Sequence, residues 1–243
     1  MNSITPVITI DGLASSGKST VSKKLSKELG FYILDSGILY RTFAYLKTIA
    51  EIELFNQDNI SKSIRNIYLE PTNNLSFNVL FKSTNITKYL HSEEIGHLAS
   101  VVSKSEVLRS ALLPLQHACI KKPGLIANGR DMGTKVFPNS ILKLYFTADL
   151  EIRAKRRYDQ LLKNGSDPKL EDIRKSLEDR DKKDINRDIS PLKAAKDAVI
   201  IDSTQLNVES ILDKILELYK ITGTWIIRGY YINGTPIRIW NFV

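Results

Sequence analysis

The residues with the clearest chemical potential stand near the start of the chain, where Gly12 is followed after four residues by Gly17-Lys18-Ser19. This is the spacing of a phosphate-binding loop (P-loop), in which glycines let backbone N–H groups point at phosphate oxygens. Lys18 would add positive charge near the β- and γ-phosphates, and the Ser19 hydroxyl would bind Mg²⁺. The loop residues expected to hold a nucleoside triphosphate are Gly12, Leu13, Ala14, Ser15, Ser16, Gly17, Lys18, Ser19 and Thr20.

The sequence on either side supports this interpretation. The β-branched run Val7–Ile10 comes before the loop, and Val21, Leu25 and Leu29 form one stripe of a helix after it. A strand before the loop and a helix after it are the context that the motif requires. The positive end of the helix dipole would favour phosphate as well. The sequence therefore predicts that the chain binds a nucleoside triphosphate.

Arginine residues follow two further segments that are expected to be strands. Asp35-Ser36-Gly37 leads into Tyr40-Arg41, and Arg130 stands in Asn128-Gly129-Arg130-Asp131. In an open α/β sheet the carboxyl ends of the strands line the ligand crevice. The planar guanidinium group binds phosphate through two donors and does not lose its proton. We therefore expect Arg41 and Arg130 to bind a second, phosphate-bearing substrate, as phosphoryl transfer requires.

Two further basic groups follow. Arg153, Arg156 and Arg157 share one expected helix, and a mixed-charge segment runs from 180 to 187. Charged runs on helices are commonly solvated faces, and this is the expectation for most of the lysines.

Five short apolar runs are expected to be the core strands. They are Val7–Ile10, Tyr32–Leu34, Leu125–Ala127, Ile141–Phe146 and Ala198–Ile201. Helical periodicity separates most of them, which predicts an α/β fold with a doubly wound, parallel, five-stranded sheet. Their nearly continuous apolar character is typical of parallel strands buried on both faces.

The segment from about 51 to 89 differs in character. Ile67–Glu70, Leu75–Phe81 and Ile86–Thr87 are expected to be short strands separated by turns, and they predict a small antiparallel β insert. Further on, Pro114 lies within a helical segment and is expected to kink or interrupt it near Leu113.

Composition excludes several kinds of protein. The formal net charge of +8 favours anionic partners without distinguishing nucleic acid from nucleotides. A lone cysteine, Cys119, excludes an internal disulfide framework, and the three histidines lack metal-ligand spacing. The sequence shows no signal peptide and no apolar stretch long enough to span a membrane. A cytoplasmic location without a membrane partner is therefore expected.

Several blocks together resemble the bacterial cytidylate kinases. They are Ile10–Thr20, Leu34–Gly37 with Tyr40-Arg41, Gly129–Thr134 with Val136–Pro138, Asn186-Arg187 before Pro191-Leu192, and Ala198–Asp202 with Ser203-Thr204. The resemblance covers residues 4 to 221, and the Gly-Arg-Asp-Met-Gly-Thr block is more specific than the P-loop. It implies a nucleoside monophosphate kinase domain over 1–221, with a monophosphate-binding insert at about 51–89 and a helical lid at about 153–187. It also implies transfer of the γ-phosphoryl group of ATP to CMP or dCMP, with Mg²⁺.

The resemblance further implies roles for single residues. Those that would contact the cytosine edge or lie beside it are Ser36, Ser100, Arg109 and Asp131. Those that would hold the sugar are Arg180 and Asp184, and those that would bind the acceptor phosphate are Arg41, Arg130 and Arg187. Arg153 and Arg157 would belong to a lid that closes over the transferring group. The expected catalytic residues are therefore Lys18, Arg130, Arg153, Arg157 and Arg187.

The chain departs from the family pattern at two places. The family usually carries an aspartate where this chain has Asn128, which keeps the shape and loses the charge, so a higher Mg²⁺ requirement is expected. Residues 222–243 extend beyond the pattern, and Asn233-Gly234 between β-prone runs predicts a hairpin there. This extension is either a partner surface or a segment without a role in the chemistry.

Two other readings stay open. A different nucleoside monophosphate kinase would act on UMP, AMP or dTMP, and the choice of base rests on the resemblance alone. A nucleotide-dependent switch or an RNA-binding protein is supported only by the basic charge. An RNA binder is expected to interleave aromatic and basic residues on a strand platform, whereas here the aromatic residues are concentrated in the tail. The expected partners are thus ATP and CMP or dCMP, with no nucleic acid, and the chain is expected to be a monomer.

Overall fold

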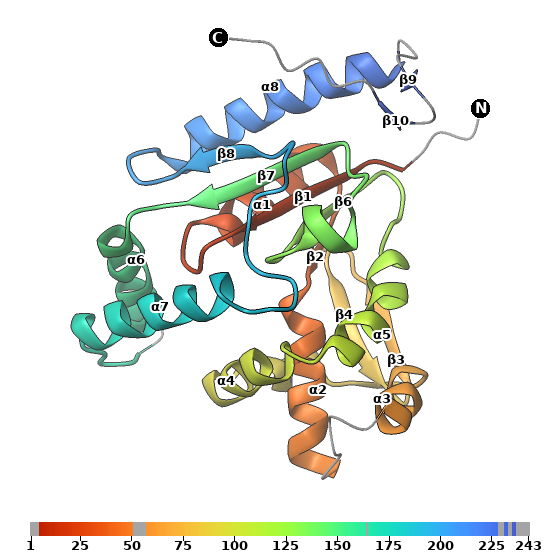
Figure 1. Ribbon diagram of the computed structural model, residues 1–243, viewed down its shortest axis with the longest axis vertical. Coiled ribbons are helices and arrows are strands. Elements are labelled where there is room, and N and C mark those ends of the chain that lie inside the picture. Colours follow the sequence, from red (N-terminus) through yellow and green to blue (C-terminus); the bar gives the residue numbers. More distant parts are fainter. Residues whose placement is uncertain (1–4, 51–56, 164, 228–230, 233–234, 237–243) are drawn as a thin grey trace.

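The computed structural model describes residues 5–50, 57–163, 165–227, 231–232 and 235–236. Its centre is a sheet of five parallel strands with helices on both faces (Figure 1). In spatial order the strands are β2 (Tyr32–Asp35), β6 (Leu125–Asn128), β1 (Val7–Gly12), β7 (Leu142–Thr147) and β8 (Val199–Asp202). The predicted doubly wound sheet is confirmed, and all five apolar runs form its strands.

The helices around this sheet occupy the segments between the strands. They are α1 (Lys18–Leu29), α2 (Gly37–Ala50), α3 (Gln57–Ile64), α4 (Glu93–Val102), α5 (Glu106–His117), α6 (Leu150–Lys163), α7 (Leu170–Ile185) and α8 (Val208–Ile227). Two shorter helical segments are η1 (Thr87–His91) and η2 (Met132–Val136). Helices α6 and α7 pack against each other beside the sheet, in the region expected to be the lid.

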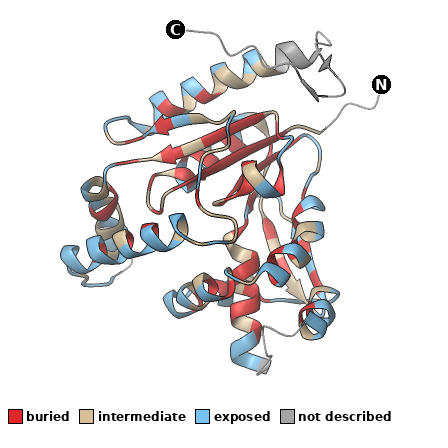
Figure 2. Cartoon of the chain, viewed as in Figure 1, coloured by how far each residue is buried: buried red, intermediate tan, exposed pale blue. Residues whose placement is uncertain are grey.

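The two faces of the sheet bury two separate apolar layers. Ile8 and Ile10 of β1 pack with Leu25 of α1 and Ile211 of α8, whereas Val7 belongs to the layer formed with α2 and α5. Burial is concentrated along the strands and on the helix faces that turn toward them (Figure 2). Because successive side chains of a strand point to opposite faces, an apolar residue at nearly every position is what this arrangement requires.

The insert forms a separate three-stranded antiparallel sheet, as predicted. Its strands are β3 (Ile67–Pro71), β4 (Phe77–Phe81) and β5 (Thr84–Asn85).

The third strand of the insert differs from the prediction. It covers Thr84–Asn85, and the predicted strand at Ile86–Thr87 is wrong because η1 begins at Thr87. The cause is the turn: Lys82 and Ser83 both have positive φ angles, so Phe81 pairs directly with Thr84. The turn was expected over Lys82–Asn85, but a two-residue turn normally contains glycine or asparagine, so its shorter length was not predicted.

A kink or an interruption was predicted at Pro114, and the interruption is wrong because α5 continues through the proline to His117. The kink stays a prediction. Proline removes one N–H, but the bonds on either side persist, and the Ala118 N–H donates to the Pro114 carbonyl oxygen at 3.0 Å. Leu112 and Gln116 on either side of the proline are buried, so packing holds this face in helical form.

The end of the described chain departs from the expected boundary as well. Helix α8 continues to Ile227, past residue 221, where the expected kinase domain ends. Beyond it, β9 (Tyr231–Ile232) and β10 (Thr235–Pro236) pair antiparallel. The Asn233-Gly234 pair predicted to form the turn between them lies outside the described residues. The division into a domain over 1–221 and an extension over 222–243 stays a prediction.

Candidate active site

The P-loop joins β1 to α1 at the carboxyl edge of the sheet. Gly12 has a φ angle of +138°, and a Cβ atom there would lie 2.0 Å from the carbonyl oxygen of Phe146 on β7. Gly17 has a φ angle of +89° directly before α1. Both positions therefore require glycine, one for lack of space beside β7 and both for the positive φ.

Lys18 is buried inside this loop. Its ammonium group donates to the Leu13 carbonyl oxygen and lies 3.5 Å from the Ser16 hydroxyl oxygen. Burial lowers the pKa of Lys18, and Arg130 and Arg180 lower it further, while Asp35 and Asp11 act in the opposite direction. The cation thus lies against the backbone that would surround bound phosphates.

Asp11, which the sequence analysis did not single out, connects the P-loop strand to the Gly-Arg-Asp block. Its buried carboxylate accepts the backbone N–H groups of Met132 and Gly133, both at 2.8 Å. Burial raises the pKa of Asp11 to about 6. The available signal was a carboxylate placed directly after an apolar buried strand, where an unpaired charge would be costly.

Two arginines of the predicted phosphate site, Arg130 and Arg187, converge with Arg180 of the predicted sugar site on one carboxylate. Asp184 on α7 accepts from Arg130 Nε at 2.9 Å, and its oxygens lie 4.0 Å from Arg180 Nε and 3.9 Å from Arg187 Nη1. One negative charge faces three positive charges here, so the cluster is suited to bind a further anion.

Arg187 in this cluster has one guanidinium nitrogen that lacks a hydrogen-bond partner among the described residues. Its Nε donates to the Ser190 carbonyl oxygen at 2.5 Å, but its Nη2 is buried and has no hydrogen-bond partner among the described residues. A buried guanidinium nitrogen without an acceptor is unfavourable. An oxyanion bound in the crevice would supply that acceptor.

Arg41 lies on the other side of the crevice. Its Nη1 donates to the carbonyl oxygens of Leu90 at 2.8 Å and Ser92 at 3.0 Å, just before α4. A Cβ atom at Gly96 would lie 2.8 Å from Arg41 Nη2, so the guanidinium group packs directly on α4. Its positive charge lowers the pKa of Arg180, one of the two residues predicted to hold the sugar.

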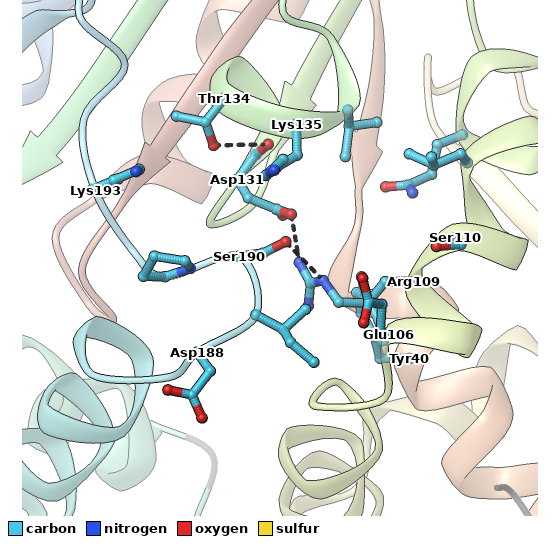
Figure 3. A pocket seen from close by; sticks show the side chains of 15 residues that line it. Tyr40, Glu106, Arg109, Ser110, Asp131, Thr134, Lys135, Asp188, Ser190 and Lys193 are labelled. Carbon is cyan, nitrogen blue, oxygen red and sulfur yellow. Dashed lines mark hydrogen bonds and ion pairs between the residues drawn. The ribbon is translucent and has the colours of Figure 1, made fainter.

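Arg109 and Asp131 form a buried ion pair, with 2.5 Å between Arg109 Nη2 and Asp131 Oδ2 (Figure 3). Arg109 also donates to the Ser103 carbonyl oxygen at 2.8 Å and to the Ser190 hydroxyl at 3.2 Å. Its guanidinium carbon lies 5.3 Å from the centre of the Tyr40 ring. The structure thus joins two predicted base-contacting residues, and adds Tyr40 and Ser190, to which the prediction gave no role.

A cavity of about 460 Å³ opens beside this ion pair (Figure 3). Arg109, Asp131 and Tyr40 line it together with Gln116, whose buried Oε1 has no hydrogen-bond partner in the described part of the chain. The cavity therefore offers charged and neutral polar groups next to apolar surface, as small-molecule sites do.

The two serines predicted to lie near the base, Ser36 and Ser100, have different surroundings from each other. Ser36 is buried against Gly129, where a Cβ atom would lie 2.5 Å from the Ser36 hydroxyl oxygen. Ser100 is half-buried on α4, and its carbonyl oxygen accepts from the Ser103 hydroxyl. The structure brings Ser36 to the Gly-Arg-Asp block, while the position of Ser100 beside a base stays a prediction.

Comparison with known proteins adds the deciding observation. A family model described as cytidylate kinase matches residues 8–221. The chain belongs to this family. A cytidylate kinase from Coxiella burnetii is 41% identical over 90% of this chain and 93% of its own length. One from Pseudomonas fluorescens is 40% identical over 89% and 96%. Among solved structures, TT1252 from Thermus thermophilus is similar with a TM-score of 0.48 and 17% identity, covering 90% of this chain and 98% of that one. The predictions of the family and of an ATP-dependent kinase are confirmed.

In this cytidylate kinase, Asn128 contacts the P-loop directly. Its Nδ2 donates to the Ser19 hydroxyl oxygen at 3.2 Å, and its side chain is buried. Ser19 itself is exposed at the start of α1. Asn128, where the resemblance implies an aspartate, is therefore in contact with the residue predicted to bind Mg²⁺.

The resemblance implies that Arg153 of α6 is a mobile lid residue, but protein groups hold its side chain in place. It is buried and donates to the carbonyl oxygens of Ala148 at 2.9 Å and Ala14 at 3.3 Å, and it pairs with Asp181 of α7 at 2.7 Å. These contacts join α6 and α7, the region predicted to be a lid, to the P-loop. In the described arrangement its donors are committed to protein groups rather than directed at a substrate.

Arg157, one turn further along α6, reaches across to the other side of the crevice. Its Nη2 pairs with Glu93 at the start of α4, and its Nη1 donates to Gln160 at 3.0 Å. Both side chains of the ion pair are partly exposed, so this contact is weak and easily exchanged for another anion. Arg157 is thus available to a phosphate, in contrast to Arg153.

Proposed function

We propose that this member of the cytidylate kinase family transfers the γ-phosphoryl group of ATP to CMP or dCMP, giving ADP and CDP or dCDP. The observation that carries the proposal is the cluster of Arg130, Arg180 and Arg187 around Asp184, with a buried guanidinium nitrogen left without an acceptor. This cluster lies beside the P-loop, because Arg130 stands two residues after Asn128, whose amide contacts Ser19 of the loop. Two phosphate sites next to each other are what phosphoryl transfer between nucleotides needs.

ATP would bind with its phosphates in the P-loop, Gly12 to Thr20. Backbone N–H groups of the loop would surround the β-phosphate, and Lys18 would leave the Leu13 carbonyl oxygen for the β- and γ-oxygens. The phosphate of the acceptor would meet Arg41, Arg130 and Arg187. This phosphate is already anionic near neutral pH, so the reaction needs no general base.

The chain's residues fit Mg²⁺ at this edge of the sheet. The Ser19 hydroxyl is exposed and is held by the amide of Asn128, and the carboxylate of Asp35 follows β2 at the same edge. These are the hard oxygen ligands that Mg²⁺ prefers. Bound there, the ion would neutralise charge on the transferring phosphoryl group.

Asp131 and Arg109 would select the base. An ionised carboxylate accepts a hydrogen bond from the amino group of cytosine but repels the carbonyl oxygen that uracil has at that position. Ser36 and Ser100 would complete the site, while Arg180 and Asp184 would hold the sugar. Of the two lid arginines, Arg157 is the one that would reach the transferring group, because closure would need only its exchange from Glu93.

The proposal is tested by measuring ADP release with a panel of nucleoside monophosphates. CMP and dCMP should give ADP well above background, with UMP and AMP far lower. ADP release with UMP or AMP but not with CMP would assign the chain to a different acceptor and overturn the proposal.

Asp131→Asn should weaken the discrimination between CMP and UMP by about tenfold or more, because an amide can also donate to the uracil carbonyl. The amide oxygen can still accept from Arg109, so the variant keeps the shape of the buried pair. The ratio of kcat/KM for CMP to that for UMP measures the effect. Lys135→Ala, an exposed residue on the wall of the same cavity, is the control. An unchanged ratio in Asp131→Asn would show that the base is read elsewhere.

Location and assembly stay predictions. None of the helices in the described segments combines the length and apolarity of a membrane span. We infer a cytoplasmic monomer whose partners are ATP and CMP or dCMP, without nucleic acid. Size-exclusion chromatography with light scattering tests this, and a mass of two or more times 27.5 kDa would contradict the monomer.

A further inference from the structure

Three strands of the central sheet end together beside the P-loop. Asp35 of β2 is in register with Asn128 of β6, which is in register with Ile10 of β1. In a parallel sheet, residues in register on neighbouring strands project to the same side. Asp35 therefore stands next to the residue whose amide donates to the Ser19 hydroxyl.

Among the acidic residues of the described strand ends, Asp35 keeps one carboxylate oxygen for a ligand. On the facing helix α7, Asp181 pairs with Arg153 through Oδ2, and its buried Oδ1 has no hydrogen-bond partner among the described residues. Asp11 accepts two backbone N–H groups, Asp131 pairs with Arg109, and Asp184 pairs with Arg130. One oxygen of Asp35, Oδ1, accepts the Gly37 N–H at 3.0 Å. Its other oxygen has no hydrogen-bond or ion-pair partner within the described segments, and the side chain is exposed. The Gly37 contact fixes the carboxylate, and the second oxygen remains for a ligand.

The negative charge of Asp35 also acts on Lys18 in the P-loop. Among acidic groups it has the largest effect on Lys18, ahead of Asp11. The next strand carries an amide at the matching position, Asn128, which can offer a metal shell a dipole but no charge. The negative charge for a divalent cation at Ser19 would therefore come from β2, through the second carboxylate oxygen of Asp35.

We propose that Asp35 is the carboxylate that holds Mg²⁺ on the nucleotide in this chain, acting on the hydrated ion as a positioning residue in place of a charge at Asn128. The inference rests on the proposed function, because it assumes a metal–nucleotide complex in the P-loop. It assigns to Asp35 an effect on metal affinity and not on the affinity for the nucleotide itself.

The test uses Mn²⁺ as a probe in place of Mg²⁺ and needs no turnover. The affinity of Mn²⁺ for the full-length protein with ADP is read from the electron paramagnetic resonance signal of the free ion. Asp35→Asn should weaken Mn²⁺ binding by about three- to tenfold, since ligand charge sets divalent affinity. Binding of ADP without metal, measured by calorimetry, should stay the same or become tighter, because a negative charge has been removed.

A double variant that moves the carboxylate from β2 to β6 gives a sharper comparison. Asn128→Asp in the Asp35→Asn background places a carboxylate at the same register position of the neighbouring strand. We expect it to restore Mn²⁺ affinity to within about twofold of the unmodified protein. Glu70→Gln, an exposed acidic position on β3 of the insert, serves as the control for a simple change in net charge.

The outcomes separate this inference from the proposed function. Unchanged Mn²⁺ affinity in Asp35→Asn, or a double variant no better than the single one, would overturn the role of Asp35 while CMP phosphorylation stands. Equal weakening of metal-free ADP binding would also overturn it, because that pattern indicates a damaged P-loop. If the unmodified protein neither binds Mn²⁺ with ADP nor phosphorylates CMP, the proposed function itself fails.

Discussion

Lys18→Ala is expected to reduce kcat for CMP phosphorylation by on the order of a thousandfold, as loss of a cation on the transferring phosphoryl group does in related chemistry. The ammonium group is buried in the P-loop and touches the loop backbone. Water is scarce there, so the charge acts strongly on developing negative charge and needs little reorganisation. The effect should fall on kcat more than on KM for ATP, because the backbone N–H groups of the loop remain.

A coupled assay for ADP release at saturating ATP and CMP measures this effect. Lys23→Ala provides a matched control, since Lys23 is an exposed lysine on the same helix, α1. Thermal unfolding of both variants should stay close to that of the unmodified protein. Near-normal turnover in Lys18→Ala would remove the P-loop lysine from the mechanism.

Arg130→Ala should lower kcat/KM for CMP by about a hundred- to a thousandfold, while the affinity for a non-hydrolysable ATP analogue stays within about twofold. Arg130 makes the 2.9 Å contact to Asp184, and the other two cations lie 3.9 and 4.0 Å from that carboxylate. Its removal takes away one phosphate ligand. It also leaves Asp184 less well compensated, so that a negative charge faces the incoming phosphate.

Calorimetric titration of CMP and of the ATP analogue tests this directly, each in the absence of the other. Arg174→Ala is the matched control, because Arg174 is an exposed arginine of the lid helix α7 that pairs with Glu151. Equal losses of affinity for both nucleotides in Arg130→Ala would contradict the assignment of Arg130 to the acceptor side.

The central sheet was predictable because its signals are local. Each strand is a short apolar run, and the P-loop glycines have conformations that other residues rarely adopt. The positions of Arg41 and Arg130 followed from the rule that strand ends line the crevice. The same reasoning misplaced the third strand of the insert, because the turn before it contains only Lys82 and Ser83, both with positive φ angles. It also predicted that Pro114 could interrupt α5, whereas packing outweighs the loss of one hydrogen bond there.

At the candidate site, the limit of prediction from the sequence was set by polar contacts between residues far apart in the chain. That Arg153 is buried between Ala14, Ala148 and Asp181 depends on how two helices meet the P-loop, and no spacing rule encodes this. The two N–H groups that Asp11 accepts lie 121 and 122 residues away in the chain. The convergence on Asp184 was not predicted, since Arg130 follows β6 whereas the other two arginines come from α7 and the segment after it.

The course of α8 has a practical consequence for handling the protein. The helix begins after β8 near the carboxyl edge of the sheet and runs back along it, so that its last turn lies at the opposite edge from the P-loop (Figure 1). A tether attached after Ile227 would therefore leave the entrance for nucleotides facing outward. Immobilised through this end on a sensor chip or a bead, the protein should capture its ligands as freely as it does in solution.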